Sequence, residues 1–344
     1  MLASILFVLA LVSTPVVSPV AISSVPDWTL STSASGTGEL VLDGDVVYVS
    51  TNDGQIRALN VGTGEIIWQT VLTETASATL TVMEDWLLVP GDHGTLYFLD
   101  LETGDTEIAE TISADSLNQP LVTENSIIVA DRSGTVVFLD RHDYAVTNTA
   151  VLPGTLTLPG ELVGDTVIFF TQDGTATSLD LEAGGIAWQA VLSYPANDVI
   201  QVENDGLIIA GQGTVMSRLN TQTGALEWEL IVSDSDAIDL ALADGDVILT
   251  TAAGAAFSMD PETGEVKWQQ VLASSTLLAS DTCDDLCILL GTDGTIGVLD
   301  TTTGEVETPL VISAPIGRAH IQQGEILVGV TGGGDVMKWD LAGQ

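Results

Sequence analysis

Short apolar runs alternate with polar turns along most of the chain. In one stretch the runs cover residues 78–83, 86–90, 95–100 and 105–112, and Gly and Asp residues separate them. Such runs, rich in Val, Ile, Thr and Leu, are typical of β-strands joined by tight hairpins. The pattern predicts an all-β protein built from four-stranded antiparallel sheets.

The pattern of four runs recurs about every forty residues. An apolar residue followed by Asn or Asp marks one column of the repeat. The pairs are Leu59-Asn60, Leu99-Asp100, Leu139-Asp140, Leu179-Asp180, Leu219-Asn220, Met259-Asp260, Leu299-Asp300 and Trp339-Asp340. Repeats of this length with four strands each are typical of the blades of a β-propeller. The eight pairs predict an eight-bladed β-propeller.

The two ends of the chain indicate how the ring closes. The last repeat stops at residues 339–341, one strand short of a blade. Trp28 lies one full period before Trp68, so residues 26–30 are expected to form a fourth strand without a blade of their own. Pairing this strand with the last sheet removes exposed edges. We therefore expect residues 24–344 to form a single propeller domain, closed by its N-terminal strand.

Residues 1–23 have the pattern of an export signal. An apolar run over residues 2–12 is followed by small residues suited to cleavage before Ser24. An uncleaved anchor is the alternative, because the apolar tract continues to Val25. No later segment approaches the roughly 18 apolar residues of a membrane span. We expect an exported protein, extracellular or in the cell envelope or periplasm, with no transmembrane segment after the signal.

The charge balance narrows the range of partners. The chain has 48 acidic and only 7 basic residues, which gives a formal net charge of −41. This charge repels phosphate backbones and anionic lipid headgroups, so we exclude nucleic acid as a partner. Hydrophobic residues make up 45% of the chain, which favours a folded protein over a disordered acidic polymer. We expect this folded protein to be a monomer.

Five tryptophans share one column, on the expected fourth strand of the repeat. They are Trp28, Trp68, Trp188, Trp228 and Trp268. A ring at this position can pack against the neighbouring blade and bury about 150–250 Å² of surface. We therefore interpret the column as structural. Ile108, Asn148 and Thr308 replace tryptophan in three repeats, where we expect weaker or different contacts between blades.

Residues 58–68, with the sequence ALNVGTGEIIW, closely resemble the tryptophan-docking motif A-x-D-x-x-T-G-x-x-x-W of pyrroloquinoline-quinone (PQQ) type propellers. Residues 179–188, 219–228 and 259–268 repeat the motif. The resemblance spans residues 26–341 and implies the propeller fold. This superfamily contains both quinoprotein dehydrogenases and non-catalytic scaffolds. With its blade number and length, the chain looks most like BamB, the outer-membrane assembly scaffold family, which implies that it binds a protein partner.

The residues that a quinone enzyme of this superfamily would need are not found. The resemblance implies adjacent cysteines, a calcium site and a catalytic aspartate in such enzymes, but Cys283 and Cys287 are not adjacent. In an exported protein these two cysteines could form a disulfide, or they could remain free thiols. We expect no catalytic activity and no cofactor. A PQQ- and calcium-dependent dehydrogenase is the least favoured alternative.

Metal binding is not expected either. The three histidines lie in different repeats, whereas a structural zinc site needs four ligands. Asp234, Asp236 and Asp239 approach one expected strand but lack the spacing of a calcium-binding loop. A solvated loop is the favoured interpretation of these aspartates.

First strands line the central channel of a propeller, so polar residues on them could face the channel or its mouth. The candidates are Asn118, Asp198, Arg318 and His320. A local ion pair is the alternative interpretation of Arg318. The favoured function is a non-catalytic scaffold that binds an envelope or extracellular protein. The alternative is a site for a sugar or other small polar ligand at the funnel mouth.

Overall fold

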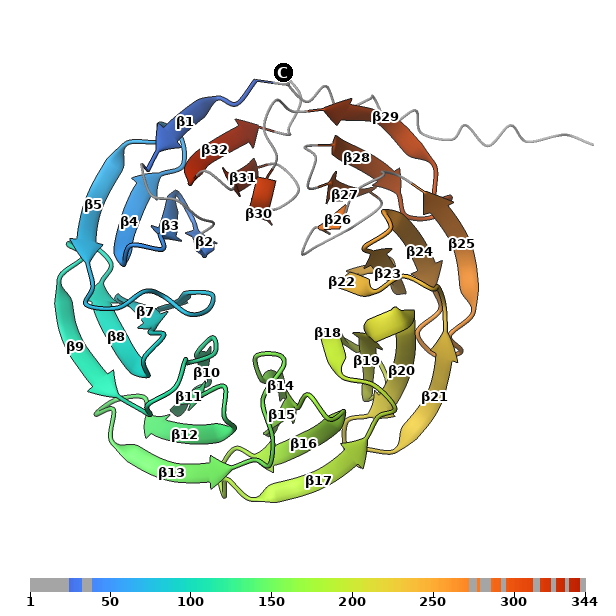
Figure 1. The fold of residues 1–344 in the computed structure, drawn as a ribbon, viewed down its shortest axis with the longest axis horizontal. Helices are drawn as coiled ribbons and strands as arrows, with labels where there is room; N and C mark the ends of the chain where they lie inside the picture. Colours follow the sequence, from blue (N-terminus) through green and yellow to red (C-terminus); the bar gives the residue numbers. More distant parts are fainter. Residues whose placement is uncertain are drawn as a thin grey trace, which may run out of the picture.

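The protein is a ring of eight four-stranded antiparallel sheets, as seen in a computed structural model (Figure 1). The structure describes residues 25–32, 39–271, 277–278, 286–291, 295–311, 316–322, 326–331 and 334–340. Within these ranges the regular structure consists of 32 strands and one short 3₁₀ turn, η1 (Gln212–Thr214). No helix in this part of the chain has the length and apolar composition needed to cross a membrane. The predicted all-β, eight-bladed propeller is confirmed.

The first four blades each take four consecutive strands, ordered from the central channel to the outer rim (Figure 1). Blade 1 contains β2 (Leu40–Asp43), β3 (Val46–Ser50), β4 (Gln55–Asn60) and β5 (Ile66–Val71). Blade 2 contains β6 (Thr81–Met83), β7 (Trp86–Pro90), β8 (Thr95–Asp100) and β9 (Thr106–Thr111). Blade 3 contains β10 (Leu121–Val122), β11 (Ser126–Ala130), β12 (Thr135–Asp140) and β13 (Val146–Val151). Blade 4 contains β14 (Glu161–Val163), β15 (Thr166–Phe170), β16 (Thr175–Asp180) and β17 (Ile186–Val191).

The next three blades follow the same order, and the last one differs. Blade 5 contains β18 (Ala196–Val202), β19 (Gly206–Gly211), β20 (Val215–Asn220) and β21 (Leu226–Ile231). Blade 6 contains β22 (Ala237–Ala243), β23 (Asp246–Thr251), β24 (Ala255–Met259) and β25 (Val266–Val271). Blade 7 contains β26 (Leu277–Leu278), β27 (Leu286–Gly291), β28 (Thr295–Asp300) and β29 (Val306–Val311). Blade 8 combines β30 (Ile316–Gln322), β31 (Ile326–Thr331) and β32 (Asp335–Asp340) with β1 (Trp28–Ser31).

The N-terminal strand closes the ring, as predicted. β1 pairs antiparallel with β32, with Trp28 opposite Lys338 and Ser31 opposite Asp335. Lys338 Nζ also donates a hydrogen bond to Asp27 Oδ2 over 2.7 Å. The last blade therefore gains its outer strand from the other end of the chain, so that no blade is left with a missing strand.

The third and fourth strands of a blade are joined by a turn that the Asn/Asp column forms. In blade 2, Asp100 Oδ1 accepts hydrogen bonds from the backbone N–H groups of Glu102 and Thr103. Gly104 ends the turn with a φ of +73°, where glycine is unstrained. The Thr103 N–H, above all, holds the pKa of the Asp100 carboxyl below its usual range. The repeated Asx–Gly spacing is therefore turn chemistry.

The apolar core lies between neighbouring blades. Tyr48 and Ile56 of blade 1 form one buried cluster with Leu87 and Val89 of blade 2. Comparable clusters join the following blades around the described part of the ring, and one joins blade 8 to blade 1. Each sheet thus buries a face against the next sheet, and the ring is held together by contacts between neighbouring repeats.

Candidate functional site

The five tryptophans of the repeat column dock onto the next blade. Each indole Nε1–H donates to a backbone carbonyl 33 residues further along the chain. The pairs are Trp28–Val61 (2.7 Å), Trp68–Leu101 (2.7 Å), Trp188–Thr221 (2.8 Å), Trp228–Pro261 (3.2 Å) and Trp268–Thr301 (2.8 Å). The Trp188 ring lies so close to Gly224 that a Cβ there would be 2.4 Å from it. The column serves the packing of blade against blade.

Blades 2 and 3 use other residues for this contact. Ile108 stands in the tryptophan column, and Tyr144 replaces the turn glycine that would face it, with a φ of +61°. The Tyr144 ring lies 4.7 Å from the Phe98 ring, centroid to centroid, in the cluster that includes Ile108. In blade 3, Asn148 donates its Nδ2–H to Ala183 O over 2.7 Å. Tyr144 thus fills the space that a tryptophan ring occupies in other blades. The Asn148 amide keeps the hydrogen bond to the next blade that the indole N–H makes elsewhere.

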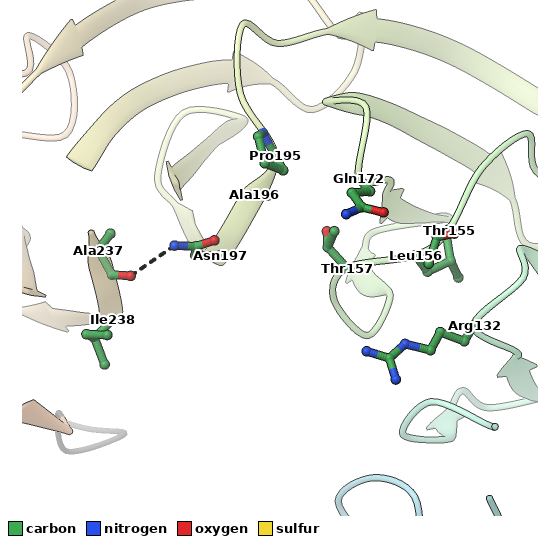
Figure 2. A pocket seen from close by; sticks show the side chains of 10 residues that line it. All are labelled: Arg132, Thr155, Leu156, Thr157, Gln172, Pro195, Ala196, Asn197, Ala237 and Ile238. Carbon is green, nitrogen blue, oxygen red and sulfur yellow. Dashed lines mark hydrogen bonds between the residues drawn. The ribbon is translucent and has the colours of Figure 1, made fainter. Parts of the chain in front are cut away.

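In blades 4 to 6, one position near the start of the inner segment turns toward the channel mouth (Figure 2). In blades 5 and 6 this position is a β-bulge, because Asn197 and Ile238 have no partner opposite them in the ladder. A bulge re-aims the side chain of its extra residue. Thr157 holds the same place in blade 4, directly after the bridge between Leu156 and Thr171. We call this place in the repeat the rim position.

Two of the four predicted channel-mouth residues have described side chains. Asn118 occupies the rim position of blade 3, and its Nδ2 is buried without a hydrogen-bond partner in the described part of the protein. Asp198 lies one residue past the rim position, and its Oδ2 accepts from Leu240 N of blade 6 over 2.6 Å. Burial, followed by the charge of Asp198, raises the pKa of Glu161 on β14. The Asp198 side chain of blade 5 is thus hydrogen-bonded to the backbone of blade 6.

The remaining predictions fall wholly or partly outside the described residues. Arg318 and His320 lie on β30, but their side chains are not among those described. The same is true of Thr308 on β29, and Cys283 lies outside the described ranges. Cys287 is buried and disulfide-bonded. The bond between Cys283 and Cys287 stays a prediction, which the mass of the protein before and after reduction would test.

A hollow of about 520 Å³ lies at the channel mouth over blades 3 to 6 (Figure 2). We call it the rim hollow. Its polar lining consists of Arg132, Thr155, Thr157, Gln172 and Asn197. Figure 2 shows the Arg132 guanidinium extended toward the open centre, with Thr157 and Gln172 on the adjoining blade. Asn197 donates its Nδ2–H to the Ala237 carbonyl over 3.1 Å, which fixes its amide at the edge of the hollow.

A second hollow, of about 900 Å³, lies at the opposite ends of the strands of blades 3 and 4. We call it the acidic hollow. Carboxylates dominate its charged lining, namely Glu124, Asp140, Asp165, Asp180 and Glu182. The two hollows therefore present opposite electrostatic surroundings, although the same pair of blades contributes to both.

A group of metal-ligating side chains that sequence reasoning missed lies near blade 2. Glu74, from the connection between β5 and β6, meets Asp92 and His93, and one ligand atom from each lies within 4.8 Å of the others. These groups already bond locally, because His93 Nδ1 lies 2.6 Å from Asp92 Oδ1 and Tyr97 donates its hydroxyl to Glu74 Oε1. Glu74 lies 18 residues before Asp92 in sequence, so spacing alone did not reveal it.

Exposed apolar side chains are concentrated on the outer strands. Among the described residues, all but two of the large exposed apolar side chains lie on β5, β13, β17, β21 or β25. The most exposed of these end their strands at matching places of the repeat: Val71, Val151, Val191, Ile231 and Val271, each between 66% and 76% exposed. Each of these strands is also the edge of its sheet. Among the described residues, exposed apolar side chains are thus concentrated on the outer strands of blades 1 and 3 to 6.

The ring of four-stranded blades, with its tryptophan docking, defines the protein as an eight-bladed β-propeller of the PQQ-like repeat class. A family model described as outer membrane protein assembly factor BamB matches residues 21–82, 52–201 and 196–337. The chain belongs to this BamB family of PQQ-like propellers.

Solved structures share the fold. The crystal structure of the computationally designed protein Ika8 is 15% identical, with a TM-score of 0.79 over 89% of this chain and 96% of that one. BamB from Moraxella catarrhalis is 18% identical, with a TM-score of 0.75 over 93% of this chain and 98% of that one. No curated protein matches the sequence. At these identities the two structures show the fold alone.

Proposed function

We propose that the protein is a non-catalytic scaffold, exported to the cell envelope or the extracellular space, that binds another protein. The family supports this proposal, because its description is that of an assembly factor for outer membrane proteins. A rigid ring that buries its apolar residues between blades can present a large fixed surface. Scaffolds with such surfaces specify partners through the side chains they expose.

The observation that carries the proposal is the set of exposed apolar side chains on the outer strands of blades 1 and 3 to 6. Val191 is 76% exposed and Ile231 is 73% exposed, and both end an edge strand. Two or three exposed apolar side chains share each of these outer strands, as Ile186 and Val191 share β17, and a partner can cover such a group in one contact. Edge strands also offer free backbone N–H and C=O groups to an extended segment of a partner. The partner is therefore expected to contact the outer strands.

Site-specific photo-crosslinking in the native host tests this contact. A photoreactive residue at position 191 or 231 should capture a defined partner protein, which mass spectrometry identifies. The control carries the same residue at Asp173, an exposed turn position near the channel mouth. A matched Val191→Thr variant, which keeps the shape and removes apolar surface, should lower the yield at position 231. Equal crosslinking at positions 173, 191 and 231 would contradict a contact on the outer strands.

Export has its own test. Fractionation of the host and mass spectrometry of the N-terminus should find the protein outside the cytoplasm, beginning at or near Ser24. A cytoplasmic protein that retains residue 1 would contradict the exported role.

The absence of catalysis belongs to the same proposal. Addition of pyrroloquinoline quinone and calcium, followed by assays for dye reduction and for a shift in melting temperature, tests it. We expect neither a change in dye colour nor a thermal shift. Dye reduction that depends on both additions would overturn the non-catalytic assignment.

The rim hollow favours a second candidate function, the binding of a small polar ligand. Its volume of about 520 Å³ falls in the range of roughly 300–1,000 Å³ that is usual for small-molecule sites. Its lining combines a guanidinium, two hydroxyls and two amides with apolar side chains such as Ile238. Calorimetric titration with neutral and acidic sugars tests this candidate, and no heat of binding with either class would contradict it.

A further inference from the structure

The lining of the rim hollow differs in charge from the rest of the molecule. The chain has 48 acidic residues, yet among the residues that the structure describes neither Asp nor Glu lines this hollow. The acidic hollow on the other side of blades 3 and 4 has five carboxylates in its lining. Within the described part of the chain, the rim hollow is therefore a recess at the channel mouth with a basic group and no carboxylate in its lining.

Arg132 is the charged group of the rim hollow, and its guanidinium is not used in the fold. Among the described residues, no hydrogen-bond or ion-pair partner faces this guanidinium, and the side chain is exposed. The other described basic side chains are engaged in the structure. Arg141, Arg218, Lys267 and Lys338 pair with carboxylates, and Arg57 is buried and bonds to Gln55.

The turn that carries Arg132 is stable without its side chain. Asp131 caps the turn by accepting hydrogen bonds from Ser133 Oγ and Thr135 N, each over 2.8 Å. The Arg132 backbone N–H donates to Ser116 O over 2.9 Å. Gln172 holds the same place in the turn of blade 4, and it also lines the hollow. The two side chains are thus aimed at the hollow by a framework that does not depend on them.

We propose that the rim hollow binds a small carboxylate that also carries hydroxyl groups, such as a sugar acid, with Arg132 holding the carboxylate. The planar guanidinium matches a carboxylate with two parallel hydrogen bonds. Gln172, Thr157 and Asn197 supply amide and hydroxyl groups for the ligand's hydroxyls. The inference rests on the second candidate function, the binding of a small polar ligand, and names its ligand class.

The charge of the whole molecule limits the ligand further. A net charge of −41 repels an approaching anion, and the repulsion grows with the number of charges on that anion. A single carboxylate that meets Arg132 at short range experiences an attraction that salt screens little, whereas long-range repulsion is screened beyond about 8 Å at physiological ionic strength. The hollow is therefore suited to a ligand with one carboxylate and neutral polar groups.

Isothermal titration calorimetry with D-glucuronate, and with D-glucose as its neutral counterpart, tests the inference. The Arg132→Gln variant removes the charge and leaves a polar amide on a shorter side chain. The matched control is Arg141→Gln, because Arg141 pairs with Glu84 away from the hollow. Circular dichroism and the melting temperature establish that both variants fold.

The protein should bind glucuronate more tightly than glucose. Arg132→Gln should weaken glucuronate binding at least tenfold, about 1.4 kcal/mol, while Arg141→Gln leaves it unchanged. A trisaccharide that carries one terminal uronate on two neutral sugar residues separates two sources of this ligand. Tighter binding than the monomer supports a polysaccharide chain end, and equal binding supports a free sugar acid.

Two results would overturn the inference, and they differ in what they leave standing. If glucose and glucuronate bind equally and Arg132→Gln changes neither, the role of the carboxylate is wrong, but the polar-ligand function stands. If neither sugar binds, both are wrong.

Discussion

The contact between Trp188 and Gly224 allows a quantitative test of how the blades hold together. Trp188 is 8% exposed and donates its indole N–H to Thr221 O. Replacing it by alanine should cost about 3–5 kcal/mol of unfolding free energy, the range for large-to-small changes of buried aromatic residues. Gly224→Ala should also destabilise the fold, because its Cβ would lie 2.4 Å from the ring.

Two effects contribute to the cost of Gly224→Ala, and they can be separated. The φ of Gly224 is +70°, where an L-residue loses roughly 1–2 kcal/mol. Overpacking against the ring adds about 1–3 kcal/mol. Without the Trp188 ring only the backbone part remains. The double variant should therefore be more stable than the sum of the single variants predicts, by about 1–3 kcal/mol.

Urea unfolding followed by circular dichroism measures the four free energies, since it does not depend on the fluorescence of the removed tryptophan. Gly164→Ala is the matched control, because Gly164 has a φ of +56° and nothing within 4 Å of its added Cβ. It should show the backbone cost alone. If Gly224→Ala costs the same with and without Trp188, to within about 0.5 kcal/mol, the steric part of the reasoning is wrong.

Three further predictions concern turns and closure. Ile108→Trp should lower the melting temperature, because Tyr144 already fills the space beside residue 108. Adding Tyr144→Gly should restore it, because the double variant recreates the tryptophan–glycine contact of the other blades. A double variant no more stable than Ile108→Trp would contradict this reasoning. Deleting residues 26–33 should destabilise the ring strongly, because β32 loses β1, the strand that pairs with its outer edge. A melting temperature within a degree or two of the parent would contradict closure. The pKa of Asp260 is lowered, chiefly by the Thr263 N–H, so its contribution to stability is present above the ordinary aspartate pKa and lost as pH falls through the folded value. Asp260→Asn keeps the turn, as Asn60 does in blade 1, and should flatten the fall of melting temperature with acid; an unchanged pH profile would contradict that cause.

The fold could be predicted from the sequence because its determinants are local and repeat. Each hairpin between third and fourth strands needs an Asx residue to accept backbone N–H groups and a glycine at positive φ. Asp100 and Gly104 meet these needs in one blade, and Asn60 and Gly64 meet them in another. Because every blade has the same local requirements, the same residues recur about every forty positions. The number of these repeats gives the number of blades.

The candidate site could be predicted only in part, because bulges and long-range contacts place its residues. Asn118 precedes the first strand of its blade, β10, and occupies the rim position. In blade 5 the sequence indicates Asp198, whereas the bulge aims the neighbouring side chain of Asn197 at the rim hollow. A bulge of this kind leaves the forty-residue spacing of the repeat unchanged, so the period does not reveal it. Glu74 reaches His93 across a connection between two blades, which spacing also does not reveal.

Positions that obey the repeat and positions that depart from it have different roles in this ring. A tryptophan or turn glycine recurs because every blade needs the same packing, and a change there is compensated nearby, as Tyr144 compensates for Ile108. The turn residue at Arg132 is under no such constraint, because the backbone and Asp131 hold its turn. Its counterpart is Gln172 in blade 4 and Ala252 in blade 6. Side chains that the fold does not require can differ from blade to blade. A binding site in a propeller is therefore expected at these variable positions, and the periodicity that reveals the blades does not indicate which of them carry it.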